Sequence, residues 1–423
     1  MIIRKIKLFL PVIIAVIVAT TMSVAGTCFA GTVHSEAPTS GSRPGESTVL
    51  TGIDVLERNN FRQLDSQRIG LITNQTGINA AGISTIQLLY DAKNIDLRAI
   101  FSPEHGLLGK LDIPQIENSI DTKTGMEVFS LYGSTRKPDA DMLTGIDTLV
   151  FDIQDIGTRF YTYISTMGLA MQAAAEHNKR FVVLDRPNPI NGLTVSGPML
   201  DEGRQSFTGF HRLPVRHGMT IGELALMIKT DLVLDLELEI IQLEGWQRTE
   251  FFDTTGLPWV NPSPNMRSLT EAILYPGIGL LETTNLSVGR GTDTPFELFG
   301  APWLDGNQLV RELKQLELPG ISFTAIRFTP DASKFEGELC VGVGIRITDR
   351  EQFEPVRSGL EIAVQLRRLY PQQWEVEKYD RLLVNTAVLN AVRQARPYAD
   401  IHELFVDDLQ TFIGHRAGFL IYK

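Results

Sequence analysis

Short, wholly apolar segments alternate with helical patterns through the first half of the sequence, and this alternation limits the fold more than any other feature. The apolar segments are residues 68–73, 97–101, 127–132, 148–153 and 180–184. Intervening segments, such as residues 83–92 and 161–177, have helical spacing. Apolar strands joined by helices predict a parallel sheet that helices cover on both faces. We therefore predict an α/β fold with a Rossmann-like parallel-sheet N-terminal domain.

The second half of the chain has a mixed pattern. Residues 220–229 have helical spacing and residues 236–242 have strand character, whereas residues 258–303 are rich in Pro, Gly and Asn. We expect that long segment to be an ordered functional loop. Helix and strand patterns then continue at residues 306–316, 321–328, 341–347, 356–370 and 382–394. The predicted organisation is a Rossmann-like domain over residues 49–265 and a smaller mixed α/β C-terminal domain over residues 266–423.

Residues 1–30 have the pattern of a signal peptide. Three basic residues precede an apolar run at residues 8–19, and small residues lead to a Cys28-Phe29-Ala30 cleavage motif. The apolar run is short for a membrane span, which needs about 20 residues, so we expect cleavage; an uncleaved anchor is the alternative. Lipid attachment at Cys28 is a third alternative, which the preceding Thr27 disfavours. The chain is therefore predicted to be extracytoplasmic, either secreted or periplasmic, and to meet a membrane only through its N-terminal signal or anchor.

Composition narrows the classes of partner. Residues 31–48 are rich in Gly, Ser, Thr and Pro, which predicts a flexible tether. Residues 1–30 hold three basic and no acidic side chains, so their removal changes the formal net charge from −11 to −14. Such an acidic protein is not expected to bind nucleic acid or anionic membranes in general. Cys340 alone then remains, which excludes an intramolecular disulfide and a cysteine-based zinc site.

Signatures of several cofactor and hydrolase sites are missing. Gly342-x-Gly344 and Gly277-x-Gly279 lack the third glycine of a dinucleotide-binding fingerprint. The sequence has no Gly-Lys-Ser/Thr phosphate loop, no Gly-x-Ser-x-Gly nucleophile elbow and no His-Glu-x-x-His zinc motif. We therefore expect no cofactor, no metal ion, and neither serine-hydrolase nor metalloprotease chemistry.

Polar clusters follow four of the predicted strands, at residues 74–76, 102–106, 152–155 and 185–188. Because ligands bind beyond the carboxyl ends of parallel strands, we expect these clusters, Asn74 included, to meet at one edge of the sheet. Pro103 and Gly106 shape the turn around Glu104 and His105. A Glu in a partly apolar loop can have the raised pKa that a general acid needs. The alternative is a Glu–His pair that only caps a turn.

The cluster after residue 151 carries two carboxylates three residues apart, Asp152 and Asp155. One can cap the following helix, which contains Tyr161, and the other can bind a ligand or assist catalysis. Arg159 lies where a fork-shaped guanidinium can take a substrate carboxylate.

The remaining strand-end candidates are Asp185, Asn188 and His217. Asp185 and the adjacent arginine can equally form a purely structural pair. His217 precedes a helix that Thr220 and Glu223 are expected to cap as a capping box, which explains Glu223 without a catalytic role.

The segment 258–303 is dense in hydrogen-bonding side chains. Its candidates for ligand binding are Asn265, Glu282, Asn285, Arg290 and Thr292. Nearby aromatic side chains can stack on a ligand or anchor the segment to the core, and they are Phe296, Phe299 and Trp303.

Together these segments resemble the NamZ-type exo-β-N-acetylmuramidases, a family formerly described only as a domain of unknown function. The matching stretches run in order at residues 70–77, 102–106, 130–133, 152–163, 185–192, 197–198, 216–223, 262–266 and 283–303. The resemblance implies an active site on the Rossmann-like domain, completed by a C-terminal auxiliary domain. It also implies release of N-acetylmuramic acid (MurNAc) from non-reducing ends of peptidoglycan glycans that contain MurNAc-GlcNAc.

The resemblance implies that Glu104 is the catalytic acid/base, and the other candidates take weaker, binding roles. For the second group of a glycosidase we rank Asp152 or Asp155 above Glu282, with the acetamido oxygen of the sugar as a third route. A cation should discriminate MurNAc from GlcNAc by its lactyl carboxylate, and the candidates are Arg159 and Arg290.

Two other classes of function compete with the glycosidase. A non-catalytic protein that binds cell-wall glycans is also compatible with an export signal, a tether and a polar loop. A cell-wall amidase normally needs a metal ion or an activated Ser or Cys, whose signatures are missing.

Overall fold

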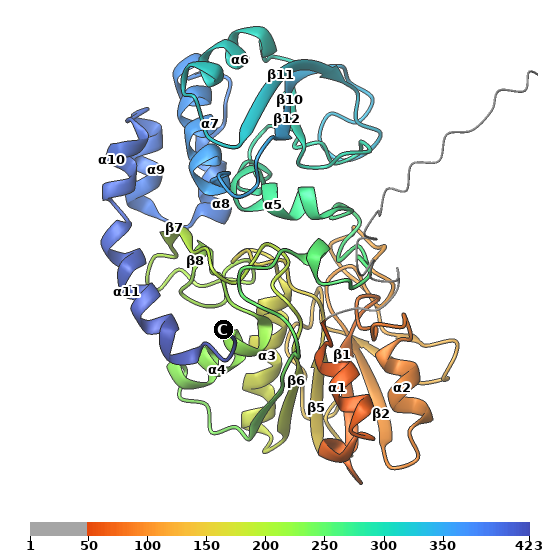
Figure 1. The fold of residues 1–423 in the computed structure, drawn as a ribbon. Coiled ribbons are helices and arrows are strands. Elements are labelled where there is room, and N and C mark those ends of the chain that lie inside the picture. Colours follow the sequence, from red (N-terminus) through yellow and green to blue (C-terminus); the bar gives the residue numbers. More distant parts are fainter. Residues whose placement is uncertain (1–48) are drawn as a thin grey trace, which may run out of the picture. The chain divides into compact units, whose positions relative to one another are not determined.

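The predicted parallel sheet is present within residues 49–423, the part of the chain that the computed structural model describes (Figure 1). Its strands run in the order β3-β4-β2-β1-β5-β6-β9, and neighbours are parallel except β3 and β4. The bounds are β1 Arg68–Thr73, β2 Asp96–Ser102, β3 Ser119–Ile120, β4 Glu127–Ser130, β5 Thr148–Asp152, β6 Arg180–Leu184 and β9 Leu238–Ile241. The predicted signal peptide and tether lie outside the described residues.

Both faces of this sheet are buried, which explains why its strands are apolar throughout. Side chains alternate between the faces, so Leu149 and Phe151 join one hydrophobic cluster while Val150 joins another. Helices α3 (Tyr163–Glu176) and α4 (Ile221–Asp231) contribute to the first cluster. Helices α1 (Gly52–Arg58) and α2 (Thr85–Asp91) contribute to the second.

A smaller antiparallel sheet follows in the chain, with the order β10-β12-β11. Its strands are β10 Leu298–Ala301, β11 Ile321–Phe328 and β12 Cys340–Ile347. The helices near it in sequence are α6 Gly306–Gln315 and α7 Pro355–Leu369. A large, mainly parallel sheet and a smaller antiparallel one confirm the predicted α/β fold class. None of the helices within residues 49–423 is long and apolar enough to cross a membrane.

The other elements are short. A hairpin joins β7 Ser196–Met199 to β8 Pro214–Arg216, and the C-terminal helices are α8 Asp380–Leu383, α9 Thr386–Arg393, α10 Tyr398–Glu403 and α11 Val406–Arg416. Single 3₁₀ turns are η1 Arg62–Leu64, η2 Phe252–Thr254, η3 Gly279–Leu281, η4 Val376–Tyr379 and η5 Ala417–Phe419.

The segment 258–303 is not one long loop as expected, because helix α5 (Leu269–Ile278) and strand β10 lie inside it. Ser268 and Glu271 cap this helix as a capping box, and every residue from Glu271 to Ile278 is buried. Burial rather than local propensity therefore stabilises a helix that contains Pro276. Helix α7 packs closely on it, since a Cβ atom on Gly359 would lie 2.6 Å from Gly277 Cα.

The register of the large sheet brings the predicted polar clusters to one edge. Thr73, the last residue of β1, pairs with Asp152, the last residue of β5, and β2 ends beside them at Ser102. The capping box at the start of α4 is also confirmed, since Thr220 Oγ1 accepts a hydrogen bond from the Glu223 amide at 3.2 Å. The sheet edge and the N-termini of the helices therefore converge on the region where a ligand site was expected.

Candidate active site

A cavity of about 220 Å³ lies next to the loop that follows β2. Six of the predicted site residues line it, namely Glu104, His105, Tyr161, Asn265, Glu282 and Arg290. They come from both sides of the predicted boundary at residue 265. A larger cavity of about 840 Å³ has His211 and Asp231 in its wall and none of the predicted site residues. We therefore place the candidate site at the smaller cavity, where the predicted chemistry gathers.

Glu104 is held by the start of helix α3. Its Oε2 accepts a hydrogen bond of 2.5 Å from Thr162 Oγ1, and Thr162 is the N-cap residue of that helix. Tyr132 also interacts with Glu104: burial first, and then the hydrogen bond and negative charge of Glu104, raise the pKa of the Tyr132 phenol. The positive end of a helix and two hydroxyl groups thus fix the carboxylate at the cavity.

Aromatic rings form one wall of the cavity. Tyr161 and Tyr163 meet edge to face with ring centroids 5.0 Å apart, and Tyr275 lies 5.1 Å from Phe160 and 4.8 Å from Phe296. All five line the cavity. Such a wall offers apolar ring faces together with phenol hydroxyls that can hydrogen-bond a bound ligand.

Tyr275 is influenced by two carboxylates, Glu104 and Glu282, which come from distant parts of the chain. Burial raises its pKa well above the ordinary value, and the negative charges of Glu282 and Glu104 raise it further. The phenol therefore stays protonated and can donate to Glu282. Glu104 and Glu282, which both line the cavity, thus act on the same buried phenol.

Arg290 is the one arginine among the side chains that line the cavity. Its Nη1 lies 2.5 Å from Glu282 Oε1, and its Nη2 forms an ion pair with Asp112. Burial lowers the pKa of Arg290, but the negative charges of these two carboxylates outweigh burial and raise it overall. Asn265 Nδ2 also donates to Asp112 Oδ2, at 3.3 Å.

Neither aspartate that the sequence ranked first as the second catalytic group lines the cavity. Asp152 is fully buried and accepts two hydrogen bonds from Arg186, at 2.6 and 3.0 Å. Asp155 is 5% exposed, accepts a hydrogen bond from the Gly157 amide at 2.7 Å, and lies 3.4 Å from His217 Nε2. The structure therefore brings Glu282 to the cavity with Glu104 and leaves Asp152 and Asp155 in a buried layer, because strand ends deliver carboxylates to such a layer as well as to a cavity.

Arg159 does not face the cavity either. Its guanidinium is fully buried and donates to the backbone carbonyl groups of Pro198, Leu213, Leu382 and Leu383. Burial lowers its pKa to about 9. The prediction that Arg159 binds a substrate carboxylate is corrected: this side chain ties three distant segments together.

Asp185 belongs to the buried layer. It accepts hydrogen bonds from Thr220 Oγ1 at 2.7 Å, the Gly222 amide at 2.8 Å and Tyr422 Oη at 2.6 Å. Burial raises its pKa to about 6. Tyr422 is the penultimate residue, so Asp185 fixes the C-terminal tail rather than a substrate.

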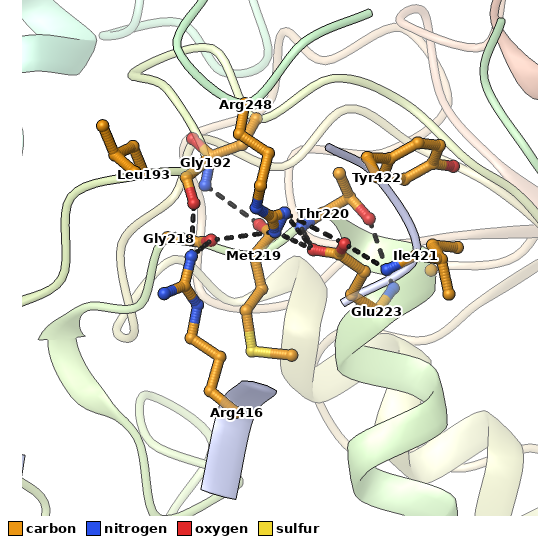
Figure 2. Close-up of polar contacts among 12 residues, drawn as sticks. Gly192, Leu193, Gly218, Met219, Thr220, Glu223, Arg248, Arg416, Ile421 and Tyr422 are labelled. Atoms are coloured by element: carbon orange, nitrogen blue, oxygen red, sulfur yellow. Dashed lines mark hydrogen bonds and ion pairs between the residues drawn. The ribbon is translucent and has the colours of Figure 1, made fainter. Parts of the chain in front are cut away.

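Figure 2 shows the polar cluster around Glu223, at the start of helix α4. Glu223 and Arg248 form a buried ion pair with an Nη2–Oε2 distance of 2.6 Å, and Glu223 Oε1 accepts a hydrogen bond from the Ile421 amide at 2.9 Å. Arg416 donates to the carbonyl of Gly218 at 2.7 Å. These contacts hold the end of the chain against the start of helix α4.

Four further predicted binding residues, Asn74, Asn188, Asn285 and Thr292, hydrogen-bond to other protein groups instead of lining the cavity. Their partners are, in that order, the Thr76 hydroxyl and the carbonyl groups of Met219, Gln373 and Gly289. Of the three aromatic candidates near the end of the segment, Phe296 lines the cavity, Phe299 is fully buried, and Trp303 packs on Tyr370 at 5.4 Å.

Sequence reasoning missed Thr162, Tyr132, Tyr275 and Asp112. Thr162 had a local signal, because a threonine directly before a helical pattern is a favoured N-cap residue. Asp112 had none, because its partner Arg290 is 178 residues away in the chain.

Comparisons with known proteins agree along the length of the chain. The family model described as the N-terminal part of exo-β-N-acetylmuramidase NamZ matches residues 69–270, and its C-terminal counterpart matches residues 273–422. The peptidoglycan β-N-acetylmuramidase NamZ of Bacillus subtilis (strain 168) is 44% identical over 378 residues, which are 88% of this chain and 91% of that protein.

Two solved structures have the same fold. Both are DUF1343 family proteins from Bacteroides fragilis NCTC 9343. The first has a TM-score of 0.83 and 37% identity, and the comparison covers 89% of this chain and 100% of that one. The second has a TM-score of 0.73 and 29% identity, with 89% and 99% covered.

Proposed function

The chain belongs to the NamZ family of exo-β-N-acetylmuramidases, and on this premise we propose that it releases MurNAc from the non-reducing ends of peptidoglycan fragments. The observation that carries the proposal is Glu104, a carboxyl group at a cavity, held by Thr162 and flanked by Tyr132. A glycosidase needs such a group to protonate the oxygen of the leaving sugar.

In the proposed reaction Glu104 gives its proton to the glycosidic oxygen as the bond between that oxygen and the anomeric carbon of MurNAc breaks. Water supplies the hydroxyl group that MurNAc gains, and its remaining proton returns to the enzyme. The Thr162 hydroxyl holds Oε2 of Glu104 and so fixes the direction of the carboxyl group at the cavity. Positioning of this kind supports general acid catalysis.

Glu282 replaces Asp152 and Asp155 as the proposed second carboxylate, because it lines the cavity with Glu104. Arg290 is the proposed partner of the lactyl carboxylate that distinguishes MurNAc from GlcNAc. A guanidinium suits that role because it binds carboxylates with two parallel hydrogen bonds. His105, Tyr161 and Asn265 are the proposed contacts to the rest of the sugar.

Residues 266–423 are proposed as an auxiliary domain that completes the site, since Tyr275, Glu282 and Arg290 come from this part of the chain. We also propose that the protein acts outside the cytoplasm, on the pattern of residues 1–30. Sequencing the N-terminus of the protein from its host should show cleavage after Ala30; an intact N-terminus in the membrane fraction would indicate an anchor instead.

The experiment that tests the function is mass identification of the products from a MurNAc-GlcNAc disaccharide. Equal amounts of free MurNAc and GlcNAc are expected, and GlcNAc-MurNAc should stay intact because its non-reducing end is the wrong sugar. Binding of the disaccharide without release of either sugar would overturn the proposal and favour a glycan-binding protein.

A further inference from the structure

Arg290 has two carboxylate partners that differ in how firmly they are held. The side chain of Glu282 is 19% exposed and forms part of the segment that follows α5. The side chain of Asp112 is 45% exposed and comes from an irregular loop between β2 and β3. Both side chains line the cavity, but Asp112 is the more exposed of the two.

The charges at the cavity disfavour an anionic ligand as long as Asp112 stays in place. Three carboxylates, Glu104, Asp112 and Glu282, line it together with the single guanidinium of Arg290. Both Nη atoms of Arg290 already contact carboxylate oxygens. A ligand carboxylate can therefore take the place of either partner on Arg290 only if that partner leaves.

The size of the cavity leads to the same conclusion. Its volume of about 220 Å³ lies below the roughly 300–1,000 Å³ that is usual for small-molecule sites. Withdrawal of Asp112 would free both space and the Nη2 donor of Arg290. It would also free Asn265 Nδ2, which donates to the same Asp112 oxygen.

We propose that Asp112 is an internal substitute for the substrate carboxylate, which the lactyl group of MurNAc displaces from Arg290 and Asn265. This proposal rests on the proposed function and adds the device by which that site selects its sugar. No covalent step is involved, since one carboxylate replaces another on the same donors.

The exchange explains how the site discriminates against neutral sugars. MurNAc breaks the Asp112–Arg290 ion pair but replaces it with an equivalent one. GlcNAc would break the same ion pair and offer no charge in return, which leaves Arg290 with one partner fewer. Asp112 therefore acts as a specificity-determining residue by making the neutral competitor unfavourable.

The loop that carries Asp112 is also connected to the catalytic segment. His105 Nδ1 lies 2.7 Å from the carbonyl oxygen of Leu111, and the Leu111 amide donates to the His105 carbonyl at 3.2 Å. His105 directly follows Glu104 and has a positive φ of 70°. Two hydrogen bonds thus join the residue before Asp112 to the residue after the proposed acid.

The test compares Asp112→Asn with the parent protein on MurNAc-GlcNAc and on the same disaccharide with its lactyl carboxylate methylated. Asn keeps the size of the side chain but removes the charge that competes for Arg290. We expect the KM for the free acid to fall about 5- to 10-fold, because less of the protein is held in the blocked state. The KM for the ester should fall by a similar factor, because a neutral ligand then no longer has to break the Asp112–Arg290 ion pair, and the kcat for both substrates should stay within about twofold of the parent values.

Two further variants separate this exchange from a general charge effect. Glu117→Gln makes the same charge change on the same loop at an exposed residue that does not line the cavity, and it should leave the KM unchanged. In an Arg290→Met background, Asp112→Asn should no longer lower the KM, because the shared donor is gone.

An unchanged or higher KM in Asp112→Asn would overturn the proposal, as would an equal fall in Glu117→Gln or a fall that persists in the Arg290→Met background. Failure of the parent protein to release MurNAc would instead reject the function on which the proposal rests. Thermal denaturation of each variant checks that folding is intact.

Discussion

Two groups of carboxylates in this molecule have opposite surroundings. The cavity group consists of Glu104, Glu282 and Asp112, which line a cavity together. The sealed group consists of Asp152, Asp185 and Glu223, each 0% exposed.

The difference lies in the partners rather than in the residue type. Each sealed carboxylate is surrounded by protein donors: Arg186 for Asp152, Arg248 for Glu223, and hydroxyl and amide groups for Asp185. Glu104 instead has the hydroxyl groups of Thr162 and Tyr132 as partners and is half-buried at the cavity. A carboxylate near a strand end is thus a candidate for catalysis only when it stays open to a cavity.

The largest expected effect concerns the cavity group. Glu104→Gln keeps a hydrogen-bonding group of the same size but cannot transfer the proton. We expect kcat for MurNAc release to fall by about 10²- to 10⁴-fold, while the melting temperature stays near that of the parent. Activity close to the parent level would place the acid at another residue.

The second prediction concerns the sealed group and stability. Arg248→Met leaves Glu223 buried without its ionic partner, which should cost about 3–5 kcal/mol of unfolding free energy. The matched control is Arg350→Met, which removes an ion pair to Asp253 that is 33% and 53% exposed and should cost only about 0–1 kcal/mol. Urea denaturation measures both, and equal losses would contradict the comparison.

The third prediction uses pH. The pKa of Asp185 is raised by burial to about 6, above the unfolded value of about 3.9. Between these values the folded state keeps a proton that the unfolded state has released, so this contribution to stability is present at low pH and is lost as the pH rises to about 6. The free energy of unfolding of the parent, relative to Asp185→Asn, should fall by about 1.4 kcal/mol per pH unit across this window.

Asp147 serves as a control, because its pKa is shifted in the opposite direction to that of Asp185. Its hydrogen bond with Arg68 lowers the pKa of Asp147 to about 2, so its contribution is present above the unfolded value and is lost as the pH falls further. Denaturation of Asp147→Asn between about pH 4 and about pH 2, below the window of Asp185, should therefore show a difference from the parent that shrinks toward low pH. The same slope for both variants would refute the assignment.

The smallest effect is expected at Thr162. Thr162→Val removes the hydroxyl that holds Glu104, and a hydrogen bond to a charged group contributes roughly 1.5–3 kcal/mol. We expect kcat to fall by about 10- to 100-fold with KM little changed, whereas Thr162→Ser should retain most of the activity. If Val and Ser behave alike, the hydroxyl does not position Glu104.

The local sequence pattern was enough to predict the strands of the large sheet. Strand β1 has the predicted bounds, and the capping box of Thr220 and Glu223 is present. Periodicity and capping depend on neighbours along the chain, so a sequence records them directly. Helix α5 was missed because Pro276 and its glycines disfavour a helix locally; burial in the core, including the contact with α7, stabilises it together with the capping box of Ser268 and Glu271.

For the site, the sequence by itself determined which segments reach the sheet edge, because polar residues directly follow buried strands, and the family resemblance implied Glu104. It did not determine which polar side chains face the cavity. The sequence gives no reason to prefer Arg290 over Arg159. In the structure, Arg159 donates to four backbone carbonyl groups, whereas Arg290 contacts Asp112 and Glu282 at the cavity. Only the tertiary structure decides this, because the partners that seal or expose a charged group come from segments far away in the chain.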